Sequence, residues 1–203
     1  MILYRVMDEV FRSWSHVAVL RALIDRTNGC TGNETARISG MHPRSAIKAL
    51  GSLEELGIVN RQRGGRDHLF SLNRDHVLVK DLLMPLYKAE SLFPHAITKE
   101  INSILKRHVI SAVIFGSVAR REEKPQSDLD LCCIVNSVRD KILVRELLNK
   151  KSKSMNAKYG IKIAPVFFTE NEFKNKRQVQ LIKEIISQGV LVVGKNPRTL
   201  ING

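Results

Sequence analysis

The stretch VIFGSVARREEKPQSDLDLCCIV, residues 113–135, decides the fold of the second half of the chain. Its apolar, β-branched beginning predicts a buried strand that ends at Gly116 and Ser117. A polar loop follows, and SDLDLCCIV then begins a second strand. Asp128 and Asp130 are two residues apart, so their side chains project from the same side of that strand.

These residues have the chemistry of a nucleotide and metal site. Without a Cβ, Gly116 lets a triphosphate approach the backbone, and the Ser117 hydroxyl can bind phosphate oxygens together with the first amides of the next helix. Arg120 follows about one turn later, near enough to counter phosphate charge. Two carboxylates on one strand face, Asp128 and Asp130, can hold Mg²⁺ and leave positions for nucleotide phosphates.

Strand, Gly-Ser, ten residues, Asp-x-Asp and strand together resemble the nucleotidyltransferase superfamily built on the palm of DNA polymerase β. GSVARREEKPQSDLDL is similar to the Gly-Ser-x-Ala-Arg-Gly-Glu and Ser-Asp-x-Asp-Leu patterns of its small branch, the minimal nucleotidyltransferases. The resemblance covers residues 109–194 and implies transfer of a nucleoside monophosphate (NMP) from a nucleoside triphosphate (NTP) with Mg²⁺. The site residues it implies are Asp128 and Asp130 for catalysis and metal binding, and Gly116, Ser117, Arg120 and Ser127 for the nucleotide.

The chain departs from this family in two places. Active relatives usually carry a third carboxylate on the strand after the next helix, and here that strand, IKIAPVFF at 161–168, has no Asp or Glu. The first acids beyond it, Glu170 and Glu172, fall at the predicted start of a helix. Arg121 stands where the family commonly has Gly. Two interpretations stay open: a nucleotide- or partner-binding module with little catalysis, or an enzyme whose acceptor or partner supplies the base.

The first eighty residues predict a different module, made of helices and a hairpin. A helix over 15–27 is followed by a Thr31-x-x-Glu34 capping box, which begins a second helix. A third helix begins at Pro43 with His42 as its cap. On a helical wheel its core face contains Ala46, Ile47, Leu50 and Leu53.

The opposite face of the third helix and the segment after it are candidates for DNA binding. Gly64-Gly65 between strand-like runs predicts a two-residue hairpin. Helix, helix, recognition helix and hairpin resemble a winged helix-turn-helix over residues 14–76, which implies double-stranded DNA as a partner. The candidate contacts are Arg44, Ser45, Lys48 and Ser52 on the helix and Arg61, Arg63 and Arg66 on the hairpin.

The composition favours a polyanionic partner. The 203 residues include 33 Lys and Arg against 20 Asp and Glu, a formal net charge of +13. Solubility alone is the alternative explanation. Residues 1–80 carry a net charge of +4 and the remaining 123 carry +9, so charge does not single out the first module as the phosphate binder.

The whole sequence therefore predicts an α+β protein with two domains, a winged helix-turn-helix at 1–80 and a minimal nucleotidyltransferase-like domain, a mixed sheet with flanking helices, at 109–203. A connector at 81–108 is expected to hold two helical stretches broken near Pro94, with apolar stripes that could serve a homodimer. No membrane span or signal peptide is expected, and three free cysteines fit a soluble, cytoplasmic protein. The family resemblance suggests a toxin–antitoxin or defence setting, with a toxin as protein partner.

Overall fold

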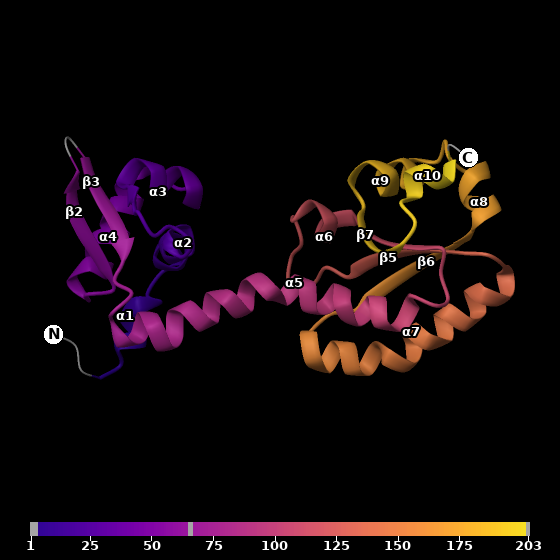
Figure 1. Ribbon diagram of the computed structural model, residues 1–203, viewed down its shortest axis with the longest axis horizontal. Coiled ribbons are helices and arrows are strands. Elements are labelled where there is room, and N and C mark those ends of the chain that lie inside the picture. The colour runs from indigo at the N-terminus through magenta and orange to yellow at the C-terminus, as the bar shows by residue number, and fades with distance from the viewer. Residues whose placement is uncertain (1–3, 65–66, 202–203) are drawn as a thin grey trace. The chain divides into compact units, whose positions relative to one another are not determined.

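The computed structural model describes residues 4–64 and 67–201, and the chain divides into two compact units, Met1–Leu92 and Phe93–Gly203 (Figure 1). Both units combine helices with a sheet, as expected for an α+β protein. Within the described ranges, no helix is both long enough and apolar enough to cross a bilayer.

The described part of the first unit begins with four α-helices and a three-stranded sheet in the order β1-β3-β2. Its elements are α1 (Val6–Val10), α2 (Trp14–Leu23), β1 (Cys30–Thr31), α3 (Gly32–Ser39), α4 (Pro43–Glu55), β2 (Val59–Gly64) and β3 (Asp67–Leu72). The strands are antiparallel, and the β2–β3 ladder extends to the pair Gly64↔Asp67. The turn expected at Gly64-Gly65 lies partly outside the described residues, and Gly64 itself belongs to the ladder.

Side chains cap α3 and α4 at the predicted places. The Thr31 hydroxyl accepts a hydrogen bond from the Glu34 backbone N–H at 3.1 Å, and His42 Nδ1 accepts one from the Arg44 N–H at 3.2 Å. The carboxylate of Glu34 binds Arg26 at 3.1 Å. The Thr31 cap is therefore confirmed, while Glu34 is used in an ion pair that the sequence did not predict.

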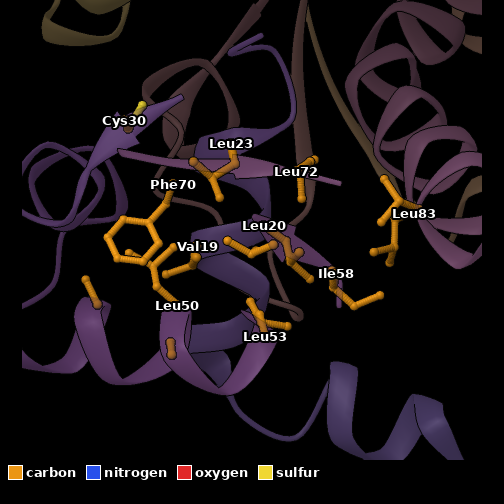
Figure 2. Close-up of a cluster of buried hydrophobic side chains, with 14 of the residues drawn as sticks. Val19, Leu20, Leu23, Cys30, Leu50, Leu53, Ile58, Phe70, Leu72 and Leu83 are labelled. Atoms are coloured by element: carbon orange, nitrogen blue, oxygen red, sulfur yellow. The ribbon is translucent and has the colours of Figure 1, made fainter. Parts of the chain in front are cut away.

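The core of the first unit lies between α2, α4 and the sheet (Figure 2). The prediction that Ile47 faces this core is wrong, because 47% of Ile47 is exposed whereas Ala49 is only 2% exposed. At about 100° per residue, Ile47 lies on the edge of the stripe that Ala49 and Leu50 share. Ile47 instead packs over the start of α3, where a Cβ on Gly32 would come within 2.8 Å of its Cγ1.

A short π-helical segment (Val79–Leu83) leads into α5 (Met84–Leu105), which contains residues of both units. The break expected near Pro94 is wrong, because α5 continues through this residue. A proline inside a helix removes one backbone hydrogen bond, here to the carbonyl of residue 90. Buried side chains anchor the helix on both sides of that position, with Tyr87 before it and Ile101 after it.

The second unit is built on a four-stranded mixed sheet in the order β6-β5-β4-β7. Its elements are β4 (Ser111–Phe115), α6 (Gly116–Arg120), β5 (Leu129–Val135), α7 (Val138–Tyr159), β6 (Ile163–Thr169), α8 (Glu170–Asn175), α9 (Gln180–Gln188), β7 (Val190–Gly194) and α10 (Pro197–Ile201). Strands β5 and β6 are parallel, and β4 is antiparallel to both β5 and β7. The mixed sheet with flanking helices agrees with the expected fold.

The pairing of β4 with β7 contains an irregularity. Ala112 pairs with Val193 and Val113 with Leu191, so Val192 is left between two pairs. Its carbonyl accepts a hydrogen bond from the Asn102 side chain of α5 at 3.3 Å.

Helices cover both faces of this sheet, and alternate residues of β5 reach each layer. Leu131 and Cys133 pack in a cluster that includes side chains of α5 and α7, while Cys132 and Ile134 pack with α8 and α9. The cysteines are buried and unpaired, and burial raises the pKa of Cys133 to about 12. Because Asp130 has the same parity as Cys132, it belongs to the face that α9 covers.

Candidate nucleotide and metal site

The glycine-serine turn and the aspartates meet where β4 ends and β5 begins. Phe115, the last residue of β4, pairs with Asp130. The next residue, Gly116, has a φ of +72°, and a Cβ built on it would lie 2.2 Å from Asp130 Oδ2. Two features therefore require glycine at this position: the positive φ of its backbone, and the Asp130 carboxylate that occupies the space of a Cβ.

Helix α6 is a single turn that begins at Gly116 and carries Ser117, which is half-buried. It ends at Arg120, and the next residue, Arg121, has a φ of 59°, in the left-handed region. The Arg121 N–H donates to the Val118 carbonyl at 3.2 Å, which closes the turn. The glycine common at this place in the family suits such a backbone, and this chain holds an arginine there instead.

The electrostatics of the site are those of crowded carboxylates. Asp128 is exposed just before β5, while Asp130 is partly buried at its second residue. Burial raises the pKa of Asp130, and the charges of Asp128 and Glu184 raise it further, while Arg120 acts in the opposite direction. A divalent cation would relieve this repulsion, so the oxygen donors present suit Mg²⁺. No cluster of three or more metal-ligating side chains occurs within residues 4–64 and 67–201.

The acids that follow β6 lie at the wrong end of the sheet to complete this site. Strand β6 runs parallel to β5 from the pair Leu129↔Ile163 to the pair Val135↔Thr169. Glu170 and Glu172 come after Thr169, about 20 Å along the strands from the Asp130 end. The Glu172 carboxylate binds Lys141 and accepts a hydrogen bond from the Thr169 N–H at 2.7 Å.

The β6 residue beside Asp130 is Ala164, which pairs with it in the parallel ladder. Residues paired across two strands project from the same face of the sheet. The position where a third carboxylate could join the aspartates is therefore occupied by a methyl group.

Glu184 of α9 is an acid at this site that sequence reasoning missed. Helix α9 packs against α6, and the Glu184 carboxylate forms an ion pair with Arg120. Its negative charge also raises the pKa of Asp130. In the sequence it is one polar residue of an amphipathic helix, and only the packing of α9 on α6 brings it to the aspartates.

Two of the predicted nucleotide-binding side chains already have partners within the protein. Arg120 binds Glu184 and donates from Nε to Glu122 at 2.8 Å. The Ser127 hydroxyl accepts a hydrogen bond from the Lys124 backbone N–H at 2.9 Å and closes a turn in the loop before Asp128.

A comparison with family models gives a match within the second unit. Residues 99–198 match the model described as Polymerase beta, Nucleotidyltransferase. The match includes the whole sheet from β4 to β7, so the contact between Gly116 and Asp130 lies inside it. We call Phe93–Gly203 the nucleotidyltransferase-like unit.

Two solved structures are similar to the chain at low identity. A crystal structure of a toxin-antitoxin with AMP-PNP covers 52% of this chain and 81% of its own, with 15% identity and a TM-score of 0.37. TrmBL2, an archaeal chromatin protein whose structure shows a novel mode of DNA binding, covers 89% of this chain and 72% of its own, with 17% identity and a TM-score of 0.28. A comparison with curated proteins gave no match.

The candidate DNA-binding residues lie in the first unit, outside the nucleotidyltransferase-like unit. Arg44, Ser45 and Lys48 are exposed on α4, and Ser52 is half-buried. On the hairpin, Arg63 is exposed, while Arg61 binds Glu54 at 2.8 Å. Arg61 also lies 5.3 Å from the centre of the Phe70 ring. Arg66 lies outside the described residues.

Proposed function

We propose that this protein is a DNA-binding regulator whose nucleotidyltransferase-like unit binds NTP with Mg²⁺ and transfers an NMP to a protein or small acceptor. The contact between Gly116 and the Asp130 carboxylate carries the proposal. It places the Gly-Ser turn, whose backbone amides can bind phosphate oxygens, directly against a side chain that can ligate a cation.

In this proposal each residue has a separate task. Asp128 and Asp130 hold the cation, and the backbone at Gly116 with the Ser117 hydroxyl binds the triphosphate. The acceptor oxygen forms a bond to the α-phosphorus, the bond to pyrophosphate breaks, and the acceptor proton passes to a base. Mg²⁺, when bound, neutralises charge on the phosphates and aligns the reacting oxygens.

Ala164 supports a second candidate function, a nucleotide- or partner-binding module without turnover. A methyl group beside Asp130 supplies neither a metal ligand nor a base. Under the first proposal, the acceptor or a partner such as a toxin supplies the base. The toxin–antitoxin or defence setting follows from the resemblance to minimal nucleotidyltransferases.

The DNA-binding part of the proposal belongs to the first unit. The succession of α2, α3, α4 and the β2–β3 hairpin supports a winged helix-turn-helix. Helix α4 exposes Arg44 and Lys48, whose charges suit phosphates beside a major groove.

Isosteric replacements of the aspartates test the transfer. The full chain is incubated with each labelled NTP, Mg²⁺ and candidate acceptors, including the protein itself, and the same is done with Asp128→Asn and Asp130→Asn. We expect label incorporation to fall by about a hundredfold or more in both variants, because each loses a cation ligand. Nucleotide binding without incorporation in the wild type, with the correct partner present, would favour the binding module.

A further inference from the structure

Most of the excess positive charge belongs to the nucleotidyltransferase-like unit. Residues 93–203 contain 20 Lys and Arg against 10 Asp and Glu, whereas residues 1–92 contain 13 against 10. The proposed DNA-binding face on α4 therefore accounts for little of the charge of the chain.

Helix α7 holds the largest share of these cations, seven Lys and Arg against two acids. In its first half two of the three cations have partners, since Lys141 binds Glu172 and Arg145 lies 5.1 Å from the centre of the Phe167 ring, while Arg139 is exposed without an ion pair to any described residue. In its second half, Lys150, Lys151 and Lys153 are exposed and form no ion pair with any described residue.

We call Lys150, Lys151, Lys153 and Lys158 the lysine cluster. Lys158 lies two turns beyond Lys151 along α7. Its ammonium binds Glu100 at 2.6 Å, and 60% of its side chain stays exposed. Lys150 to Lys158 span about 12 Å along the helix axis. Over that length a nucleic-acid duplex carries about seven phosphates, which is enough for each of the four lysines to contact one.

The surroundings of the lysine cluster favour nucleic acid over a protein partner. The large apolar side chains that α7 exposes, Val138, Ile142 and Leu143, are confined to its first half. Protein interfaces are depleted in lysine and need an apolar centre, which the described residues of the second half do not offer. Tyr159, the nearest aromatic residue, packs edge-on against Phe93 and donates to Glu100, so it does not form a stacking platform for unpaired bases.

We propose that Lys150, Lys151, Lys153 and Lys158 form a second nucleic-acid surface that binds the phosphate backbone of a duplex. The surface lies at the end of the sheet where β5 and β6 begin, because Tyr159 of α7 is soon followed by Ile163 of β6 (Figure 1). This is the Asp130 end, although α7 covers the opposite face. The proposal concerns binding alone and does not depend on NMP transfer.

Salt-dependent binding of duplexes to the full chain tests this surface. The background variant carries Arg44→Ala and Lys48→Ala, so that the proposed α4 contacts are removed. Comparison of this variant with the wild type shows separately how much the α4 face contributes to binding. The probes are a 20-bp DNA duplex and the RNA duplex of the same sequence, titrated between 50 and 200 mM KCl. Adding Lys150→Gln, Lys151→Gln and Lys153→Gln should weaken binding at least about tenfold at low salt and reduce the slope of log K against log salt by about three.

A matched triple variant separates this surface from overall charge. Lys88→Gln, Lys99→Gln and Lys106→Gln remove three exposed lysines on or just after α5 and change the net charge equally. We expect this control, and the charge-preserving variant with arginines at 150, 151 and 153, to keep the slope. The proposal would be overturned if the two glutamine triple variants lost duplex affinity equally, or if the α7 triple variant lost none. Tighter binding of poly-glutamate than of either duplex would also overturn it. The duplex that binds more tightly, DNA or RNA, identifies the nucleic acid that supplies the phosphates.

Discussion

At the residue scale, the site depends on two backbone positions of unusual conformation. Gly116 and Arg121 both have positive φ and stand at the two ends of α6. Gly116 cannot accept a side chain, because Asp130 occupies the place of its Cβ. Arg121 is an exposed residue in a conformation that costs an L-residue about 1–2 kcal/mol.

Replacing Arg121 by glycine should therefore stabilise the protein. Glycine removes the steric cost of the left-handed backbone but adds entropy to the unfolded chain, which leaves a net gain of about 0.5–1 kcal/mol. We expect the melting temperature to rise by about 1–3 °C. Arg121→Ala is the control, since it removes the same charge and keeps the strained backbone. If both variants melt alike, the backbone of Arg121 is not strained.

A second residue-scale prediction concerns Glu172. The Lys141 ammonium, with the Thr169 backbone N–H, lowers the pKa of this carboxyl to about 2. Because the folded pKa is depressed, the stabilisation is complete above the ordinary carboxyl pKa of about 4.3 and is lost as the pH falls toward 2. We expect Glu172→Gln to melt about 1–3 °C below the wild type at pH 7, with the difference shrinking between pH 5 and pH 2.

The control for this pH dependence is Glu123→Gln. Glu123 is exposed and has no ion pair among the residues that the structure describes. Its melting temperature should follow that of the wild type across the same pH range. A constant difference between Glu172→Gln and the wild type at every pH would contradict the assigned ion pair.

At the element scale, the register between β5 and β6 decides what the site contains. Parallel pairing places Ala164 beside Asp130 and sends Glu170 and Glu172 to the other end of the sheet. The packing of α9 on α6 then brings in Glu184, which binds Arg120. The acidic character of the site therefore comes from Asp128 just before β5, Asp130 on β5 and Glu184 on α9, without a contribution from β6.

Ala164→Asp tests whether this register limits metal binding. An aspartate there would stand beside Asp130 and add a third oxygen ligand, so we expect Mg²⁺ to bind on the order of tenfold more tightly. The measurement is the Mg²⁺ dependence of binding of a fluorescent NTP analogue. Ala164→Asn is the matched control, with nearly the same size and no charge. Equal Mg²⁺ dependence in the two variants would show that residue 164 does not face the aspartates.

The sequence predicted those parts of the site that lie close together along the chain. The spacing of Gly116, Asp128 and Asp130 predicts that they lie close together, because the short connection between the two strands fixes their relation. Glu184 was missed because its relation to Asp130 depends on packing between distant elements. The expected break at Pro94 failed for a similar reason, since buried residues on both sides outweigh the loss of one hydrogen bond.

At the scale of the whole molecule, charge and fold are distributed unevenly between the two units. The first unit has the small helical architecture that suits groove recognition and almost balanced charge. The nucleotidyltransferase-like unit has the larger cationic excess, concentrated on α7. If both proposed surfaces bind nucleic acid, the contacts of α4 determine which sequence is preferred. The lysines of α7 then account for most of the salt dependence of the overall affinity.

The irregular pairing of β7 bears on how the protein behaves at high concentration. An edge strand as apolar as VLVVG presents a template on which another chain could add a strand and begin aggregation. The unpaired Val192 bends the strand at its centre, and the Asn102 side chain already satisfies its carbonyl. A foreign strand approaching this edge meets a kinked ladder with one acceptor occupied, which protects the molecule from edge-to-edge association.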